Sequence, residues 1–336
     1  MLPYRLKPWI PLDKLDWYEL SMNPLAIDLL RDNPRRINWV LLAANPNPRA
    51  IELLRANLDQ RIDWGTLSSN PTPAAIDLLR ANRRRINWRN LSFNRNPAAI
   101  DLLRENLQGI DWELLSQNPN PAAVDLLREN TQQIDWYGLS KNPAAMDLLL
   151  ENQDKIDWSG LSENPAAMDL LLENPQQIDF LYLSANPNPE AIELLLENQD
   201  KIYWDFLSEN PSPGAIDLLR ANRGRINWRN LSNNLNPAAI DLLRENSDEI
   251  DWRMLSRNPG IFEKNPIKAA GKIQKAFRGS RGYAAWAYSP ERLASQGYFE
   301  NNMDFGKRRS TKRRSNTNSG MSLKTIDRLI KLIQKM

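Results

Sequence analysis

Hydrophobic and polar positions recur in one fixed order along most of the chain, and a large aromatic residue marks each recurrence. Leu stands three residues and Asn six residues after the aromatic residue in every copy, and Ser stands four residues after it except where Ala43 replaces it. The aromatic residues lie 22 to 25 positions apart, at Trp17, Trp39, Trp64, Trp88, Trp112, Trp136, Trp158, Phe180, Trp204, Trp228 and Trp252. Eleven copies of one unit therefore occupy about residues 13–262.

Each unit carries the punctuation of two short helices. Asp111 stands at an N-cap position directly before Trp112, with apolar residues at the two staple positions. The second helix begins at Asn-Pro, where Pro121 takes a first-turn position that needs no amide donor, and ends at an Asn such as Asn130, which can adopt the left-handed conformation. Helices of about seven and ten residues are unstable alone, so the pairs must stack. The pattern predicts an all-α fold, an α-solenoid of about eleven helix-turn-helix repeats, with residues 1–12 as its N-terminal cap.

The recurring residues divide into a predicted core and predicted polar links. We expect the repeated Trp, Leu and Ile side chains to be buried, and the repeated Ser and Asn side chains to form caps and turn bonds. An alternative is a ladder of Asn amides on the inner surface that binds an extended ligand.

Units of 22 residues lack one Asn-Pro pair, as at Asn142-Pro143, which places the deletion in the turn between the helices and leaves both helical faces intact.

The repeat resembles one found in known proteins. The pattern Ile-Asp-Trp-x-x-Leu-Ser-x-Asn-Pro-Asn-Pro-x-Ala-Ile-x-Leu-Leu is similar to a tandem repeat abundant in giant nucleocytoplasmic DNA viruses, and the resemblance covers about residues 13–262. It implies an interaction module, and some similar viral chains are structural components of particles. Ankyrin and tetratricopeptide units are longer, at 33 and 34 residues.

Charge separates this array from the rest of the chain. The whole sequence has 44 Lys and Arg against 41 Asp and Glu, a net charge of +3. Residues 1–258 hold 27 Lys and Arg and 36 Asp and Glu, a net charge of −9. Residues 259–336 hold 17 Lys and Arg and 5 Asp and Glu, a net charge of +12. The near-neutral total is therefore the difference between an acidic repeat array and a strongly basic tail.

One part of the array departs from the repeat pattern on its polar side. Four residues after the Ile, Val or Met of the second helix most units have Arg, but three consecutive units have Leu followed by Glu. Residues 137–200 contain 2 Lys and 12 Asp and Glu. We interpret this strip either as a solvated face or as an exposed apolar stripe for a basic amphipathic partner. Its candidate partner contacts are Leu150, Glu151, Leu172, Glu173, Leu196 and Glu197.

The tail divides into three predicted segments. Residues 263–300 form a basic helical segment that resembles the first half of an IQ motif. The basic residue that ends such a motif is replaced here by Tyr283, which disfavours a calmodulin-like partner. Residues 301–320 form a basic disordered linker, and residues 321–336 form a basic amphipathic helix. Such a helix binds an anionic membrane or an acidic apolar groove, and one candidate groove is the strip at 137–200 in the same or another copy of the chain. The IQ-like residues are Ile273, Gln274, Arg278 and Gly279; the linker cations are Lys307, Arg308, Arg309, Lys312, Arg313 and Arg314; the helix face is Leu323, Ile326, Ile330 and Ile333. We expect the linker cations to contact phosphates of nucleic acid or anionic lipid without reading bases.

Composition removes most enzyme classes. The chain has no Cys and no His, which excludes disulfides, Cys or His zinc sites and His general bases, and no phosphate loop or dinucleotide fingerprint occurs. We therefore predict no catalytic residues, no metal site and no cofactor. No run of about 18 apolar residues and no signal-peptide pattern occurs, so we expect a soluble intracellular protein, in the host cytoplasm or nucleus or in a virus particle.

Two functions follow as expectations. The first is a non-enzymatic protein–protein interaction scaffold, a structural or minor capsid-associated component of a giant DNA virus particle, with protein partners that include capsid proteins. The second is an adaptor whose basic tail binds nucleic acid or an anionic membrane while the repeat array recruits a protein partner.

Overall fold

The computed structural model describes residues 4–57 and 62–264, all of which belong to one compact unit of residues 1–269. Within it the predicted all-α repeat fold is confirmed. A typical repeat consists of a short helix that begins at the aromatic residue, a second helix after the Asn-Pro turn, and a 3-10 helix that leads into the next repeat, whereas the eleventh repeat ends after its first helix in η12 (Pro259–Ile261) and β2 (Phe262–Lys264). The short 3-10 helix is an element that the sequence pattern did not predict.

The first helix of each repeat begins at the aromatic residue, as expected. Asp111 accepts a hydrogen bond from the amide of Leu114 at 3.0 Å and so caps the helix that starts at Trp112. These odd-numbered helices are α1 (Trp17–Leu20), α3 (Trp39–Leu42), α5 (Trp64–Ser68), α7 (Trp88–Ser92), α9 (Trp112–Ser116), α11 (Trp136–Ser140), α13 (Trp158–Glu163), α15 (Phe180–Leu183), α17 (Trp204–Glu209), α19 (Trp228–Asn233) and α21 (Trp252–Arg257).

The second helix begins at the proline in the longer repeats. Asn120 caps α10 by accepting from the amide of Ala122 at 2.9 Å, and Pro121 is the first helical residue. The even-numbered helices are α2 (Ile27–Asp32), α4 (Pro48–Ala56), α6 (Pro73–Ala81), α8 (Pro97–Arg104), α10 (Pro121–Arg128), α12 (Met146–Leu150), α14 (Met168–Glu173), α16 (Pro189–Glu197), α18 (Pro213–Ala221) and α20 (Pro237–Glu245).

The 22-residue repeats lose more than a turn. The residues from Pro143 to Ala145 form a 3-10 helix, and α12 begins three residues later than the pattern implied, so the second helix itself is shortened. The helix is shorter, but its buried face stays intact, in agreement with the prediction, because Ala145, Leu148 and Leu149 remain buried.

The Asn that ends each second helix does not adopt the left-handed conformation that we expected. Asn82 has φ −132° and ψ 46°, and its side-chain amide donates to the carbonyl of Leu78 at 2.9 Å. Its own carbonyl accepts from Arg85 at 2.8 Å, which starts a 3-10 turn instead of a reversal. The 3-10 helices are η1 (Leu12–Lys14), η2 (Pro34–Arg36), η3 (Arg83–Arg85), η4 (Leu107–Gly109), η5 (Thr131–Gln133), η6 (Pro143–Ala145), η7 (Gln153–Lys155), η8 (Pro175–Gln177), η9 (Gln199–Lys201), η10 (Arg223–Arg225), η11 (Ser247–Glu249) and η12 (Pro259–Ile261).

The recurring Asn and Ser side chains join each repeat to the one before it. Asn118 is buried, and its amide donates to the carbonyls of Ser92 and Asn94, both at 3.0 Å. Its amide oxygen accepts from the backbone of Asn120 at 3.0 Å. All eleven equivalent Asn side chains bond to the preceding repeat in this way. The amides are therefore occupied inside the protein, which argues against a ligand-binding Asn ladder.

The repeated Ser supplies the second link. Ser116 donates to the carbonyl of Trp112 at 2.7 Å and accepts from the amide of Asp135, the cap of the next repeat, at 3.0 Å. The hydroxyl thus closes its own helix and positions the next one. Because both partners are backbone groups, the link repeats wherever Ser is present.

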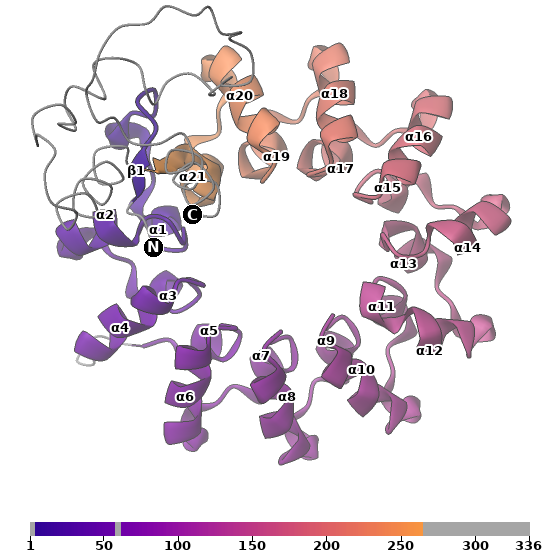
Figure 1. The fold of residues 1–336 in the computed structure, drawn as a ribbon, viewed down its shortest axis with the longest axis horizontal. Helices are drawn as coiled ribbons and strands as arrows, with labels where there is room; N and C mark the ends of the chain where they lie inside the picture. The colour runs from indigo at the N-terminus through magenta and orange to yellow at the C-terminus, as the bar shows by residue number, and fades with distance from the viewer. Residues whose placement is uncertain (1–3, 58–61, 265–336) are drawn as a thin grey trace, which may run out of the picture. The chain divides into compact units, whose positions relative to one another are not determined.

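The array closes into a ring, as Figure 1 shows. Asn23 of the first repeat donates to the carbonyls of Ser256 at 3.0 Å and Asn258 at 2.9 Å in the last repeat, and Asp16 donates from its amide to the Ser256 hydroxyl at 2.8 Å. The same Asn contacts join all the other pairs of neighbouring repeats, and the same Ser contact joins all of them except the second and third, where Ala43 replaces Ser. The repeat pattern did not predict this closure, which arises because rotation accumulates from repeat to repeat until eleven repeats complete a turn.

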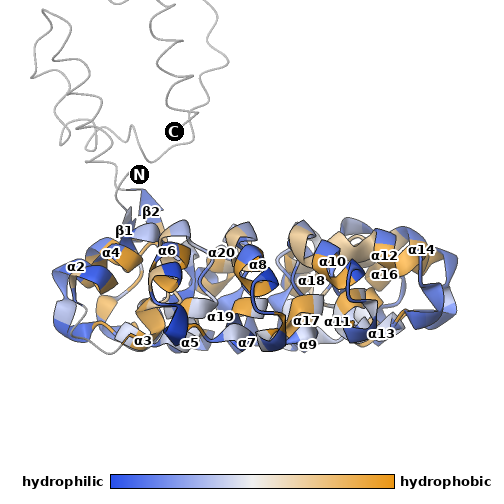
Figure 2. Ribbon diagram, turned by 90° about the horizontal axis from the view of Figure 1, so that it is seen from below, coloured by the Kyte–Doolittle hydropathy of each residue, from blue (hydrophilic) through white to orange (hydrophobic). Residues whose placement is uncertain are grey.

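A pair of strands also joins the two ends of the array. Strand β1 (Tyr4–Leu6) pairs antiparallel with β2 (Phe262–Lys264), with Arg5 opposite Glu263. Residues 1–12, expected to cap one end of the array, thus contribute a strand to the junction between its two ends. The odd-numbered helices form the inner wall of the ring and the even-numbered helices lie outside them and toward one face, as Figures 1 and 2 show.

Candidate partner-binding surfaces

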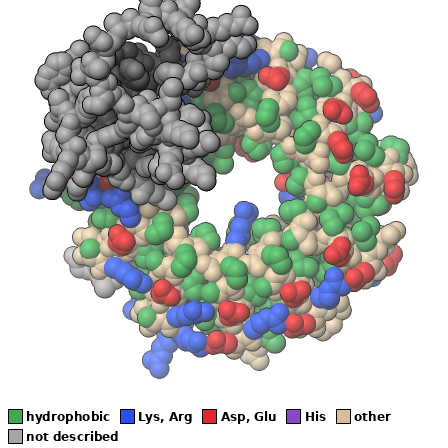
Figure 3. Space-filling view, viewed as in Figure 1, with side chains coloured by type: hydrophobic (Ala, Val, Ile, Leu, Met, Phe, Trp, Pro, Cys, Tyr) green, Lys and Arg blue, Asp and Glu red, His purple; other side chains and the backbone are tan. Residues whose placement is uncertain are grey.

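The strip predicted from the sequence lies on the outside of the ring. Leu150, Leu172 and Leu196 lie at or near the ends of α12, α14 and α16 and are 47%, 50% and 46% exposed. Acidic side chains gather over these helices, at the right of Figure 3, on the side of the ring away from the β1–β2 junction. The structure therefore brings the predicted Leu residues onto one accessible arc.

The replacement of Arg by Leu also changes the ion pairs around the ring. Arg104 pairs with Glu129 of the next repeat at 2.7 Å, and Arg128 pairs with Glu151. At the next two steps the Arg position is occupied by Leu150 and then Leu172, opposite Glu173 and Glu197. Within residues 4–57 and 62–264 these two exposed glutamates form no ion pair.

The acidic charge of the ring is concentrated in this arc. Residues 137–200 carry a net charge of −10, and the other residues of 1–258 hold 25 basic and 24 acidic residues. Because the ring is closed, the Arg-rich ends of the sequence are neighbours, and the arc faces away from them. The ring therefore has one strongly negative side.

The inner wall of the same sector holds an aromatic cluster that sequence reasoning missed. The ring of Tyr137 lies edge-on to that of Tyr182 with centroids 6.4 Å apart, although an intervening repeat separates the two residues in the chain. Gly160 in that repeat allows α13 to approach α11 closely, because a Cβ there would lie 2.8 Å from the carbonyl oxygen of Tyr137. Two effects raise the pKa of Tyr137 most: the larger is a hydrogen bond with Tyr182, and the smaller is burial. The glycines in this sector were the sequence signal from which the aromatic cluster could have been predicted.

A basic side chain completes this cluster. The Nζ atom of Lys141 lies 5.4 Å from the ring centre of Tyr137 and 5.9 Å from that of Tyr182, and 2.8 Å from a carboxylate oxygen of Glu163. The ring of Phe206 lies 6.4 Å from that of Tyr182. In Figure 3 the middle of the ring is an opening that side chains do not fill.

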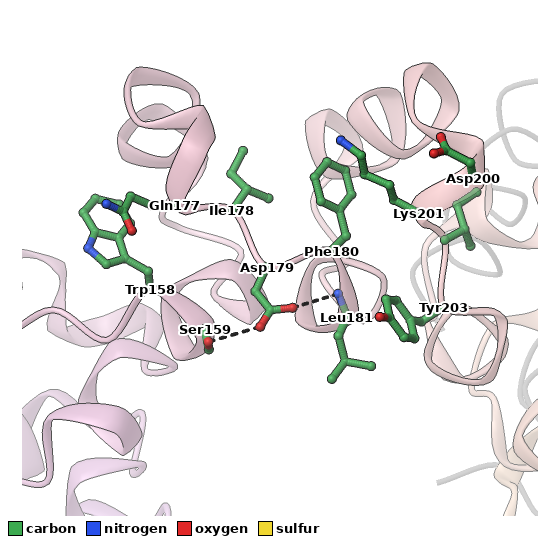
Figure 4. Close-up of a pocket in the computed structure, with 11 residues that line it drawn as sticks. Trp158, Ser159, Gln177, Ile178, Asp179, Phe180, Leu181, Asp200, Lys201 and Tyr203 are labelled. Carbon is green, nitrogen blue, oxygen red and sulfur yellow. Dashed lines mark hydrogen bonds between the residues drawn. The ribbon is translucent and has the colours of Figure 1, made fainter.

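A second unpredicted feature is an open hollow of about 730 Å³ that begins at Trp158 and ends at Tyr203. Figure 4 shows Trp158 and Gln177 on one side, Asp179 between, and Lys201 on the other side. Phe180, the one replacement of the repeated Trp, lines it, and so does Tyr203, which stands where other repeats have Asp or Asn. Two departures from the repeat pattern thus meet at one place.

The remaining predicted site residues lie outside the described residues. These are the IQ-like residues at 273, 274, 278 and 279, the cations between 307 and 314, and the apolar face at 323, 326, 330 and 333. Across residues 4–57 and 62–264 no group of three or more Asp and Glu side chains is arranged to hold a metal ion. None of the helices in that part of the chain combines the length and the apolar character that a membrane crossing requires.

Comparisons with protein-family models, with curated proteins and with solved structures found no match. The geometry of the ring and the places where individual repeats depart from the shared pattern are therefore the features that bear on function.

Proposed function

We propose that this protein is a non-enzymatic scaffold whose closed ring binds a basic, amphipathic segment of a partner protein. The observation that carries the proposal is the substitution of Leu for Arg at Leu150, Leu172 and Leu196. It exposes apolar surface and at the same time leaves Glu173 and Glu197 without the Arg that pairs with the equivalent Glu151.

The spacing of the strip suits a helix laid across the repeats. Neighbouring packed helices lie roughly 8–10 Å apart, and seven residues of an α-helix rise about 10.5 Å. A partner helix with apolar residues seven positions apart therefore meets one exposed Leu per repeat. Lys or Arg beside those positions reaches the glutamates, which favours association and sets orientation. Burying each half-exposed Leu contributes roughly 1 kcal/mol.

The test uses the full-length protein and a labelled peptide with the sequence of residues 321–336, which has apolar residues seven apart. Replacing both Leu150 and Leu172 with Arg removes two of the three exposed leucines and supplies the missing partners of Glu173 and Glu197. We expect the dissociation constant to rise at least tenfold. The matched control is Leu235→Arg, since Leu235 is 64% exposed but lies outside the strip. Equal binding by the double variant and the control would contradict the proposal.

We also propose that the ring serves as a structural or minor capsid-associated component of a giant virus particle. The resemblance of the repeat to those viral repeats supports this placement. Mass spectrometry of purified particles of a giant virus whose genome encodes this chain tests the proposal, and the protein should be present at a fixed ratio to the capsid proteins.

A second candidate function is an adaptor whose tail binds nucleic acid or an anionic membrane. The separation of charge between residues 1–258, at −9, and 259–336, at +12, favours it. Affinity of the full-length protein for DNA should fall steeply between about 50 and 200 mM salt, because phosphate contacts release counterions. Replacing the six cations between 307 and 314 with Gln should remove most of that binding, whereas an unchanged salt dependence would exclude this role for the linker.

A further inference from the structure

The two ends of the array carry complementary halves of one contact. The first repeat supplies the donors, which are the side-chain amide of Asn23 and the backbone amide of Asp16. The last repeat supplies the acceptors, which are the hydroxyl of Ser256 and the carbonyls of Ser256 and Asn258. Because the donors lie at one end and the acceptors at the other, the contact joins a first repeat to a last repeat. It is therefore a head-to-tail interface.

Charge distinguishes this interface from the contacts inside the array. Glu19 on α1 is buried and accepts from two residues of α21, from Arg253 at 3.1 Å and from Arg257 at 3.0 Å. No other repeat has a carboxylate two residues after its aromatic residue. Those positions hold Leu41, Thr66, Asn90, Leu114, Gly138, Gly160, Tyr182, Phe206, Asn230 and Met254. An interior repeat cannot replace the first one in this ion pair, so the charges select the correct pair of ends.

The strand pair adds a second contact beside the repeats. The side chain of Arg5 on β1 donates to Glu263 on β2 at 2.9 Å, and the amide of Lys7 donates to the carbonyl of Ile261 at 2.9 Å. Each strand has three residues, and an isolated strand pair is marginally stable in water. The strands therefore pair where the two end repeats hold them together.

No chain link joins the two ends at this contact. Asn23 and Ser256 lie 233 positions apart, although α1 and α21 are side by side in Figure 1. Every other contact in the ring joins repeats that are consecutive in the chain. Opening the ring here breaks only non-covalent contacts and leaves a donor end and an acceptor end on the same molecule. Each end then matches the opposite end of a second copy.

We propose that the junction is an interaction surface for a second copy of this chain, and that opened rings join head to tail. The first repeat of one copy docks on the last repeat of the next through the contacts that close the ring. Within one chain the covalent connection gives the two ends a high effective concentration, so the closed ring prevails in dilute solution. Joined copies continue past one full turn and therefore wind into a superhelix. This surface is separate from the outer strip and does not depend on the proposed function.

The test uses two full-length variants with reversed charges at opposite ends. One carries Glu19→Arg, and the other carries Arg253→Glu together with Arg257→Glu. Within either variant the junction brings like charges together in a buried place, which opens the ring. In an equimolar mixture the altered first repeat of one variant matches the altered last repeat of the other, and the two unaltered ends match as well. Native mass spectrometry of the mixture should show species with twice the mass of one chain or a higher multiple.

The separate proteins are the controls for this mixture. Each variant alone should stay monomeric and keep its helical circular dichroism, because only one of the contacts between repeats is altered. A mixture of the two folded variants that contains single chains only would overturn the proposal. The unaltered protein should also stay monomeric at the same concentration. If it forms the same multiples, association does not need an open ring, and the proposal is wrong.

A cross-link tests the same contact with the junction charges unaltered. The chain has no Cys, and Arg5 and Glu263 are opposite each other in the strand pair, a separation that a disulfide spans. Both side chains are accessible, with exposed fractions of 43% and 34%, so single Cys substitutions there should leave the fold intact. A mixture of Arg5→Cys and Glu263→Cys is held in urea below the unfolding midpoint, which opens the junction, and is then oxidised.

The matched control replaces Arg5→Cys with Leu235→Cys, since Leu235 is 64% exposed and lies away from the junction. We expect the yield of disulfide-linked pairs of chains to be roughly tenfold higher for Arg5→Cys than for this control, because docking raises the effective concentration of the two thiols. Equal yields would overturn the proposal, since the copies would then meet at random.

Discussion

The ring junction and the outer strip use the same repeat but treat their glutamates in opposite ways. At the junction Glu19 is 2% exposed and accepts from Arg253 at 3.1 Å and from Arg257 at 3.0 Å. On the strip Glu173 and Glu197 are exposed, and the residues that would pair with them are leucines. The junction has two cations around one buried carboxylate, whereas Glu173 and Glu197 of the strip have no cation paired with them in the described part of the chain.

This difference indicates what each region does. A buried carboxylate with two guanidinium groups tolerates little displacement, so it favours one alignment of the first repeat on the last. Exposed carboxylates beside apolar side chains leave interactions available to another molecule. The closed contact therefore maintains the ring, and the open one suits a partner.

The largest expected effect comes from removing the cations at the junction. Replacing both Arg253 and Arg257 with Ala leaves Glu19 buried without a cation, which should lower the free energy of unfolding by roughly 3 kcal/mol. Urea denaturation measures this loss. Adding Glu19→Gln to the same variant should restore part of the stability, because it removes the buried charge. No rescue would show that the charges do not act together.

The next prediction tests whether the junction resembles an interior contact. Asn23→Ala and Asn118→Ala each leave two buried carbonyls without a donor, and each should cost about 1–3 kcal/mol. In a closed ring the two losses are similar, since both side chains bond to a preceding repeat. In an open array Asn23→Ala would be nearly neutral. The comparison of the two unfolding curves therefore reports directly on closure.

A smaller gain should follow from completing the Ser links. The junction has the Ser256–Asp16 link, but Ala43 carries no hydroxyl to accept from the amide of Asp63. Ala43→Ser adds the missing acceptor at a buried position that Ser occupies in the other repeats, and should stabilise the protein by about 1 kcal/mol. Thermal unfolding checks this. A lower Tm would show that the second repeat differs in geometry from the rest.

The smallest effect should come from giving the strip the ion pairs that its neighbours have. Leu172→Arg should raise the free energy of unfolding by only a few tenths of a kcal/mol, because an exposed pair with Glu197 is weak. Leu235→Arg, which has no Glu opposite it by the same pattern, serves as the control. A large loss of stability in Leu172→Arg would mean that this side chain supports the fold and is not free for a partner.

Several parts of the fold could be predicted because they depend on neighbours in the chain. The start of the helix at Trp112 follows from Asp111, and the start of α10 follows from Asn120-Pro121. The end of each second helix was predicted less well. The conformation of Asn82 depends on the 3-10 turn that follows it, and no strong sequence signal marks that turn.

The candidate surfaces were predicted in part for the same reason. Exposure of Leu150, Leu172 and Leu196 followed from their position on an amphipathic helix. The contact of Tyr137 with Tyr182 did not, because it bridges across a whole repeat, and the pattern within one repeat does not show which side chains meet across it. The hollow at Trp158 depends on the sizes of side chains in three repeats, which periodicity does not measure.

By itself the sequence determined the repeat, its helices and the faces that stack, because caps, prolines and helical periodicity act over a few residues. Only the tertiary structure decided that the array closes. A small rotation between neighbours has no local signature, and its sum over eleven repeats brings Asn23 to Ser256 and Glu19 to Arg253, 234 positions away along the chain.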